Sequence, residues 1–146
     1  MPTLGAADDF ATELSDAGVG TLAGTSGWGI YIGQEPDIDV SEKVIVLYDA
    51  GGSPPNPKWL FEEPTVRIRI RGAVQGYAAG YTKCVEIKDA LLGLSPKTIA
   101  TTRYVGIVQI SDILFLNNDD KNRPLFSMLF RAMREPATGT NRTALS

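Results

Sequence analysis

The sequence contains no histidine and a single cysteine, Cys84. Without histidine, the chain lacks the commonest general base, the usual zinc ligand and the usual pH switch. One cysteine cannot form a disulfide within the chain, and it cannot complete a tetrahedral zinc site. We therefore predict no metal, no cofactor and no histidine-dependent triad, and we expect a reducing compartment.

Signals for nucleotide binding and for membranes are also missing. Two glycine-rich stretches, residues 18–20 and 24–29, neither follow a predicted strand nor open a predicted helix, and no Gly-Lys-Ser or Gly-Lys-Thr sequence occurs. The N-terminus has no basic region followed by an apolar run. The longest apolar run, residues 105–116, is interrupted by polar residues and is too short to cross a bilayer. These absences predict a soluble, cytosolic protein with no membrane partner.

The composition is acidic and globular. The formal net charge is −3 and the pI is about 4.9, so the chain as a whole is not expected to hold a phosphate backbone. Of the 146 residues, 43% are hydrophobic and 21% are charged, which is typical of a folded chain. We predict a single domain over residues 1–136, followed by a flexible polar tail over residues 137–146.

One stretch, residues 64–93, organises the predicted fold. Between residues 65 and 71, apolar side chains alternate with Arg67, Arg69 and Arg71, which indicates a strand with one buried face. Apolar residues then recur at helical spacing over residues 74–92, and a glycine follows as a stop. We expect this helix to fold back over the apolar face of the strand.

The remaining elements are predicted from the same two periodicities. A short helix is expected over residues 8–17, and further strands over residues 28–33, 43–49, 98–116 and 125–133. The last two strands flank a polar turn and should form a long antiparallel hairpin. Because strands lie on both sides of one long helix, we predict an α+β fold: a mostly antiparallel sheet of about five strands, packed by that helix and by a short N-terminal helix.

The three arginines of the central strand are the sharpest charged feature. They repel one another at spacings of roughly 7 Å, so an acidic group should lie opposite them. The candidates are Glu62, Glu63, or Asp119 and Asp120 of a neighbouring subunit, the last two lying beside Arg123 in the predicted turn. This favours a subunit or partner interface. The alternative is an exposed sheet face on which charges prevent aggregation.

Residues 50–63 form an irregular segment, with glycines and three prolines followed by Trp59 and Phe61. Loops of this length are uncommon unless they bind a partner or move. The two aromatic residues either anchor the loop to the core or anchor another chain. The paired carboxylates of the sequence are expected to be solvated caps and turns, Cys84 is expected to be a small core residue, and no residue is predicted to be catalytic.

Several stretches, taken in their order and spacing, resemble the small tail terminator, or tail completion, proteins of long-tailed bacteriophages, a family also described as minor capsid proteins. The stretches are Val66–Gly72 running into Tyr77–Tyr81, the helix exit Leu91–Leu94, the hairpin Asn117–Phe130 followed by Arg134–Pro136, and more loosely Ile30–Pro36. The loop at residues 50–58 departs from the pattern expected of the family.

The resemblance implies a structural virion protein. Such proteins form rings, usually hexamers, at the head-proximal end of the tail tube, where they stop tube polymerisation and present the surface that the head connector joins. The implied partners are further copies of the chain, the tail tube protein and the head–tail connector protein, with DNA passing through the lumen without specific binding. The implied location is the virion tail, after assembly in the host cytoplasm.

Three other functions remain open on the residues alone. An adaptor or stopper on the head side of the connector has the same composition as a tail terminator. A small-ligand binding domain would line a pocket with Trp28, Trp59 and the tyrosines. An enzyme is the weakest of the three, because only the paired carboxylates support it.

Overall fold

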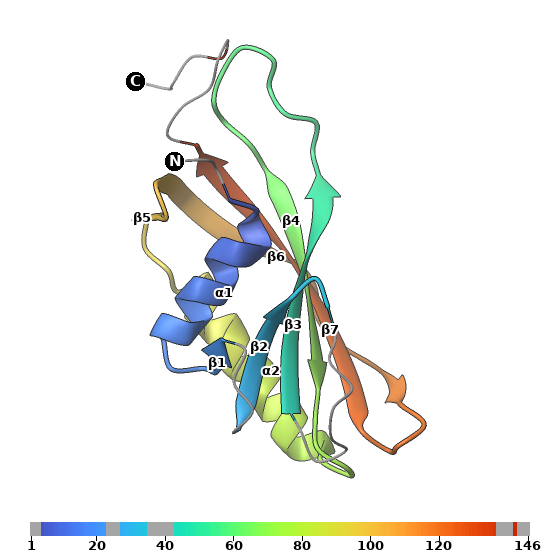
Figure 1. Ribbon diagram of the computed structural model, residues 1–146. Helices are drawn as coiled ribbons and strands as arrows, with labels where there is room; N and C mark the ends of the chain where they lie inside the picture. Colours follow the sequence, from blue (N-terminus) through green and yellow to red (C-terminus); the bar gives the residue numbers. More distant parts are fainter. Residues whose placement is uncertain (1–3, 23–26, 35–42, 137–141, 143–146) are drawn as a thin grey trace.

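The computed structural model describes residues 4–22, 27–34, 43–136 and 142, and within these ranges the chain forms two helices and seven strands (Figure 1). In chain order they are α1 (Ala6–Asp16), β1 (Thr21–Leu22), β2 (Trp28–Ile32), β3 (Lys43–Gly52), β4 (Pro64–Arg71), α2 (Tyr77–Leu92), β5 (Lys97–Ile99), β6 (Thr102–Asn118) and β7 (Pro124–Glu135). The predicted tail, except Arg142, and residues 24–26 of the second glycine-rich stretch lie outside the described residues.

The strands form one curled sheet in the order β1-β2-β3-β4-β7-β6-β5, with both helices packed against the same face (Figure 1). The pairs β1–β2 and β2–β3 are parallel, and the other four pairs are antiparallel. The predicted fold, a mostly antiparallel sheet of about five strands packed by one long helix, is therefore wrong. The sheet is larger and mixed, and the helices are short, with 11 and 16 residues.

The missed strands have a simple physical cause. β1 has two residues, which is too short for an alternating pattern to be read. β5 was predicted as part of one strand over residues 98–116, but Ala100 and Thr101, with φ of 47° and 72°, turn the chain so that β5 pairs antiparallel with β6. The parallel pairing of β2 with β3 depends on how the chain between them returns, and alternation within a strand carries no information about its direction. The helix α2 also begins three residues later than predicted, because Gln75 adopts a φ of 56° in the turn that precedes it.

The core lies between the two helices and the inner face of the sheet. Val66, Ile68 and Ile70 of β4 are fully buried there, as their alternation predicted. Ile68 and Ile70 lie in register with buried residues of both neighbouring strands, for example Ile68 with Leu47 and Met128. Cys84 is buried in the same cluster, and burial raises the pKa of its thiol to about 12.

A glycine allows α2 to approach the sheet closely. A Cβ atom at Gly80 would lie 2.8 Å from Cε2 of Phe126 on β7. No larger residue fits there without displacing the phenyl ring. Gly80 thus sets the distance at which the helix covers the β6–β7 hairpin.

The predicted hairpin at the end of the domain is present. β6 and β7 pair in antiparallel register from Arg103↔Glu135 to Asn118↔Pro124, with several register shifts in between. Neither helix in the described part of the chain has the length and apolar character needed to cross a membrane.

Candidate interaction surfaces

The three arginines of β4 lie on the outer face of the sheet, opposite the helices, but their environments differ. Arg67 is exposed and donates from Nη1 to Oγ of Ser127 on β7 at 2.9 Å. Arg69 is half-buried, and Arg71 is only 3% exposed. Of the three arginines, Arg67 and Arg69 therefore keep exposed surface, whereas Arg71 is enclosed within the subunit.

The two aspartates of the turn between β6 and β7 also differ in their environments. Oδ1 of Asp119 accepts hydrogen bonds from the backbone N–H groups of Lys121 and Arg123, at 3.0 and 2.9 Å. Its Oδ2 accepts from Nε of Arg123 at 2.8 Å. Burial by itself would raise the pKa of Asp119, but these bonds from Arg123 and Lys121 outweigh it, and the pKa lies below its ordinary value. Asp119 and Arg123 thus hold the turn together, while Asp120 is exposed.

The irregular segment is shorter than predicted, because β3 continues to Gly52. Within it, Oδ1 of Asn56 accepts from the N–H groups of Lys58 and Trp59 at 2.8 and 2.9 Å, which fixes a local turn. The ammonium of Lys58 lies 4.9 Å from the centroid of the Trp59 ring. Leu60 is 3% exposed and anchors the loop, whereas Trp59 and Phe61 are half-buried and keep some exposed surface.

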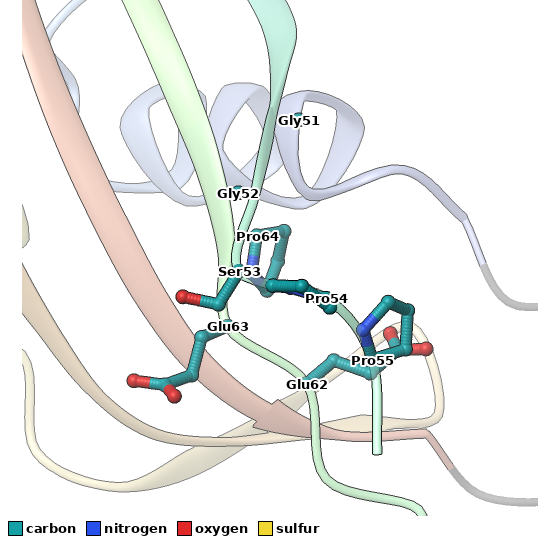
Figure 2. Close-up of a pocket in the computed structure, with 8 residues that line it drawn as sticks. All are labelled: Gly51, Gly52, Ser53, Pro54, Pro55, Glu62, Glu63 and Pro64. Carbon is teal, nitrogen blue, oxygen red and sulfur yellow. The ribbon is translucent and has the colours of Figure 1, made fainter. Parts of the chain in front are cut away.

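A shallow depression lies at the base of this loop (Figure 2). It has a volume of about 360 Å³ and is lined by Gly51, Gly52, Ser53, Pro54, Pro55, Glu62, Glu63 and Pro64. A second depression of about 460 Å³ lies between residues 17–19 and α2. Neither is lined by Trp28, Trp59 or a tyrosine, the residues that the small-ligand hypothesis placed in a pocket. Within the described ranges, no three cysteine, aspartate or glutamate side chains gather to hold a metal ion.

A buried polar network joins parts of the chain that are far apart in sequence, and the sequence analysis missed it. Tyr104 on β6 donates to Oδ2 of Asp9 on α1 at 2.5 Å. The guanidinium of Arg134 on β7 donates to the Tyr104 hydroxyl at 3.3 Å, to the carbonyl of Leu4 at 3.0 Å and to Oε1 of Glu62 at 3.2 Å. The network fastens α1, the hairpin and the end of the loop to one another.

Burial shifts the pKa values of this network. It raises the pKa of the Asp9 carboxyl and the pKa of the Tyr104 hydroxyl. The hydrogen bond to Asp9 adds to the rise at Tyr104. Burial by itself would lower the pKa of Arg134, but Tyr104 and Glu62 more than compensate, and the guanidinium stays charged. One sequence signal was available: Asp9 falls on the same helical face as the apolar residues of α1.

Exposed apolar residues gather at the β6 end of the sheet. On β6 they are Val105, Val108, Ile110, Leu114, Phe115 and Leu116, each 40–52% exposed. Tyr77 and Tyr81 on α2 are 50% and 44% exposed and belong to an aromatic cluster with Phe115. The sequence signal for this surface is the run of four apolar residues at 113–116, which strict alternation cannot bury on one face.

Comparisons with known proteins point to an assembly component. The family model of the bacteriophage tail terminator protein matches residues 13–136. No curated protein matches the chain. Among solved structures, a chain from the virion of a native gene transfer agent particle shares the fold, with a TM-score of 0.63 and 17% identity, over 88% of this chain and 92% of that one. The protein belongs to the bacteriophage tail terminator family and is a structural component of the virion tail.

Proposed function

We propose that the protein forms a ring at the head-proximal end of the phage tail tube, where it ends tube polymerisation and joins the tail to the head connector. The observation that carries this proposal is the family match, which covers residues 13–136. The expected ring is a hexamer. Its partners are further copies of the chain, the tail tube protein and the connector protein.

The distribution of surface features supports a ring. A cyclic assembly other than a dimer needs two different surfaces on each subunit, because every contact is head-to-tail. The described residues offer several unlike surfaces: the arginine-bearing outer face of β4, the turn with Asp120, the half-buried aromatic residues of the loop, and the apolar end of the sheet at β6. The formal net charge of −3 also suits a lumen through which DNA slides, because few phosphate contacts mean little retention.

The arginine face is proposed as one side of a subunit or partner contact, with Arg67 and Arg69 as its accessible members. Reversing the charge in Arg67→Glu should weaken ring formation or tail joining about tenfold, since a desolvated charge pair across an interface becomes a repulsion. Arg103→Glu, an exposed arginine at the start of β6, is the matched control. Sedimentation measures the fraction of each variant that forms rings, and equal fractions would show that Arg67 does not lie in the interface.

Electron microscopy tests the proposed function most directly. The purified protein, alone and with tail tube protein, should give rings with a central hole and tubes capped at one end. Tails assembled without it should exceed their normal length and fail to join heads. Rings that decorate purified portal or connector complexes and never tubes would instead assign the protein to the head side. A strict monomer in both conditions would contradict the proposal.

A further inference from the structure

The strand β6 has a long edge that the rest of the described chain leaves open. β5 pairs only with residues 102–104, and β7 occupies the opposite edge along the whole strand. From Val105 to Asn118, no strand in the described ranges pairs with the outer edge. The backbone N–H and C=O groups along this outer edge are therefore available to form hydrogen bonds with another strand.

The middle of this edge is blocked by its own side chains. Oδ1 of Asp112 accepts from the N–H of Ile113 at 2.7 Å, and Nε2 of Gln109 donates to the carbonyl of Ser111 at 3.1 Å. The ammonium of Lys88 on α2 lies 3.2 Å from the same Asp112 oxygen. The register with β7 also shifts here. The edge is thus divided into two segments, residues 105–108 and residues 114–118.

The segment at residues 114–118 lacks the features that protect exposed edges. Leu114, Phe115 and Leu116 are consecutive and are 52%, 40% and 44% exposed. Residues 113–118 contain no charge and no proline, although lysine and proline are the usual means of keeping an edge from pairing. An apolar, uncharged edge of this kind is expected to be covered in the working protein.

An aromatic surface adjoins this segment. The rings of Tyr77 and Phe115 lie 5.1 Å apart, and those of Tyr77 and Tyr81 lie 6.5 Å apart. Phe126 lies beneath them, with its centroid 5.2 Å from that of Tyr77 and 5.6 Å from that of Phe115. Half-exposed tyrosines held by a buried ring are the rigid anchors that carry binding energy at interfaces.

We propose that residues 114–118 of β6 pair as a sheet edge with a strand of a second copy of this chain, and that Tyr77 and Tyr81 pack against the added strand. The partner surface is the opposite end of the sheet, at β1 and β2, where Leu22 and Ile32 are 44% and 40% exposed. Two ends of one sheet are different surfaces, as head-to-tail assembly requires. Residues 114–118, 21–22 and 28–32 contain no charged residue, so charge repulsion does not oppose a contact between these two edges.

This inference rests on the proposed ring, and a matched pair of variants distinguishes a failure of the strand pairing from a failure of the ring itself. Leu116→Lys places a charge on the edge at a side chain that is 44% exposed. Leu92→Lys does the same at the end of α2, where the side chain is 42% exposed and belongs to no strand. Light scattering and sedimentation should show at least a tenfold loss of ring for Leu116→Lys and an unchanged ring for Leu92→Lys, with circular dichroism confirming that both variants fold. Equal rings in the two variants would overturn the inference and leave the proposed function standing.

Hydrogen exchange on the wild-type protein gives a second test that needs no variant. In the ring, amides within residues 114–118, and at the other end of the sheet within residues 21–22 and 31–32, should exchange at least tenfold more slowly than in the dissociated subunit, because strand pairing occupies them. Unchanged exchange at 114–118 would overturn the inference. So would protection that appears only when tail tube protein is added, or a closed dimer in place of a ring. A wild-type protein that never forms a ring, with or without tubes, contradicts the proposed function itself.

Discussion

The two ends of the β6–β7 hairpin are built in opposite ways. At the proximal end, Tyr104 and Arg134 are buried and bonded to Asp9 of α1 and Glu62 of the loop. At the distal end, residues 114–116 are exposed, and the turn that follows is held by its own Asp119 and Arg123. The same pair of strands thus fastens parts of the domain together at one end and exposes an apolar edge at the other.

This difference between the two ends lets effects on folding stability be measured separately from effects on assembly. A substitution in the buried network at the proximal end disturbs groups that are shielded from water, so its cost falls on folding. A substitution on the distal edge changes groups that water already solvates, so it should cost little folding stability, and under the proposed strand pairing its cost falls on contacts with other chains. Variants along one hairpin can therefore distinguish the two roles without moving to another part of the molecule.

The largest expected effect is that of Arg134→Leu. Removing the guanidinium leaves the carboxylates of Asp9 and Glu62 without their shared partner, and breaking a buried ion pair in this way costs about 3–5 kcal/mol of unfolding free energy. Urea denaturation followed by tryptophan fluorescence measures the loss. Arg103→Leu, at the same end but exposed, is the control and should cost less than about 0.5 kcal/mol. Similar losses in both variants would mean that the network does not fasten these parts of the domain together.

An intermediate effect is expected for Asp119→Ala in the turn. The variant loses bonds to two backbone N–H groups and to Arg123, which is 2% exposed, for a cost of about 1–3 kcal/mol. Asp120→Ala, the exposed neighbour, should be neutral. Because the folded-state pKa of Asp119 is lowered, its contribution is complete above the ordinary value of 3.8 and disappears as the pH falls through the folded-state value. The difference between the two variants should therefore shrink in acid, and a constant difference would contradict this account of the turn.

The sequence predicted what is local. The alternation of β4 correctly identified Val66, Ile68 and Ile70 as core residues, and the helical spacing located α2 to within three residues at its start. The number and direction of the strands were not predicted. β1 is too short to show a period, β5 and β6 were predicted as one strand, and strand direction is set by the path of the chain between strands.

The candidate surfaces were predicted less completely, because residue type does not determine burial. Arg71 and Arg123 were proposed as interface residues from the strand alternation and the charged turn, and in the subunit they are 3% and 2% exposed. The open edge beside the apolar residues 114–116 was not predicted, because the sequence does not show which strands lie next to β6. The burial of these residues depends on which neighbours the sheet brings to them, and those contacts are distant in sequence.

The smallest and most informative effect is that of Asp9→Asn, which tests whether the buried network depends on charge or on hydrogen bonding. The amide oxygen of asparagine can still accept from the Tyr104 hydroxyl, so the variant should lose much less unfolding free energy than Arg134→Leu.

Burial raises the folded-state pKa of Asp9, so the folded protein binds a proton more tightly than the unfolded chain does. Between the ordinary value of 3.8 and the folded-state pKa, wild-type stability should fall as the pH rises, the reverse of the trend at Asp119, and Asp9→Asn should lack this component. Urea denaturation of both proteins from about pH 3 to pH 7 measures the difference. A variant that loses stability relative to wild type as the pH rises would show that the ion pair with Arg134, 4.0 Å away, outweighs the cost of burying the carboxylate.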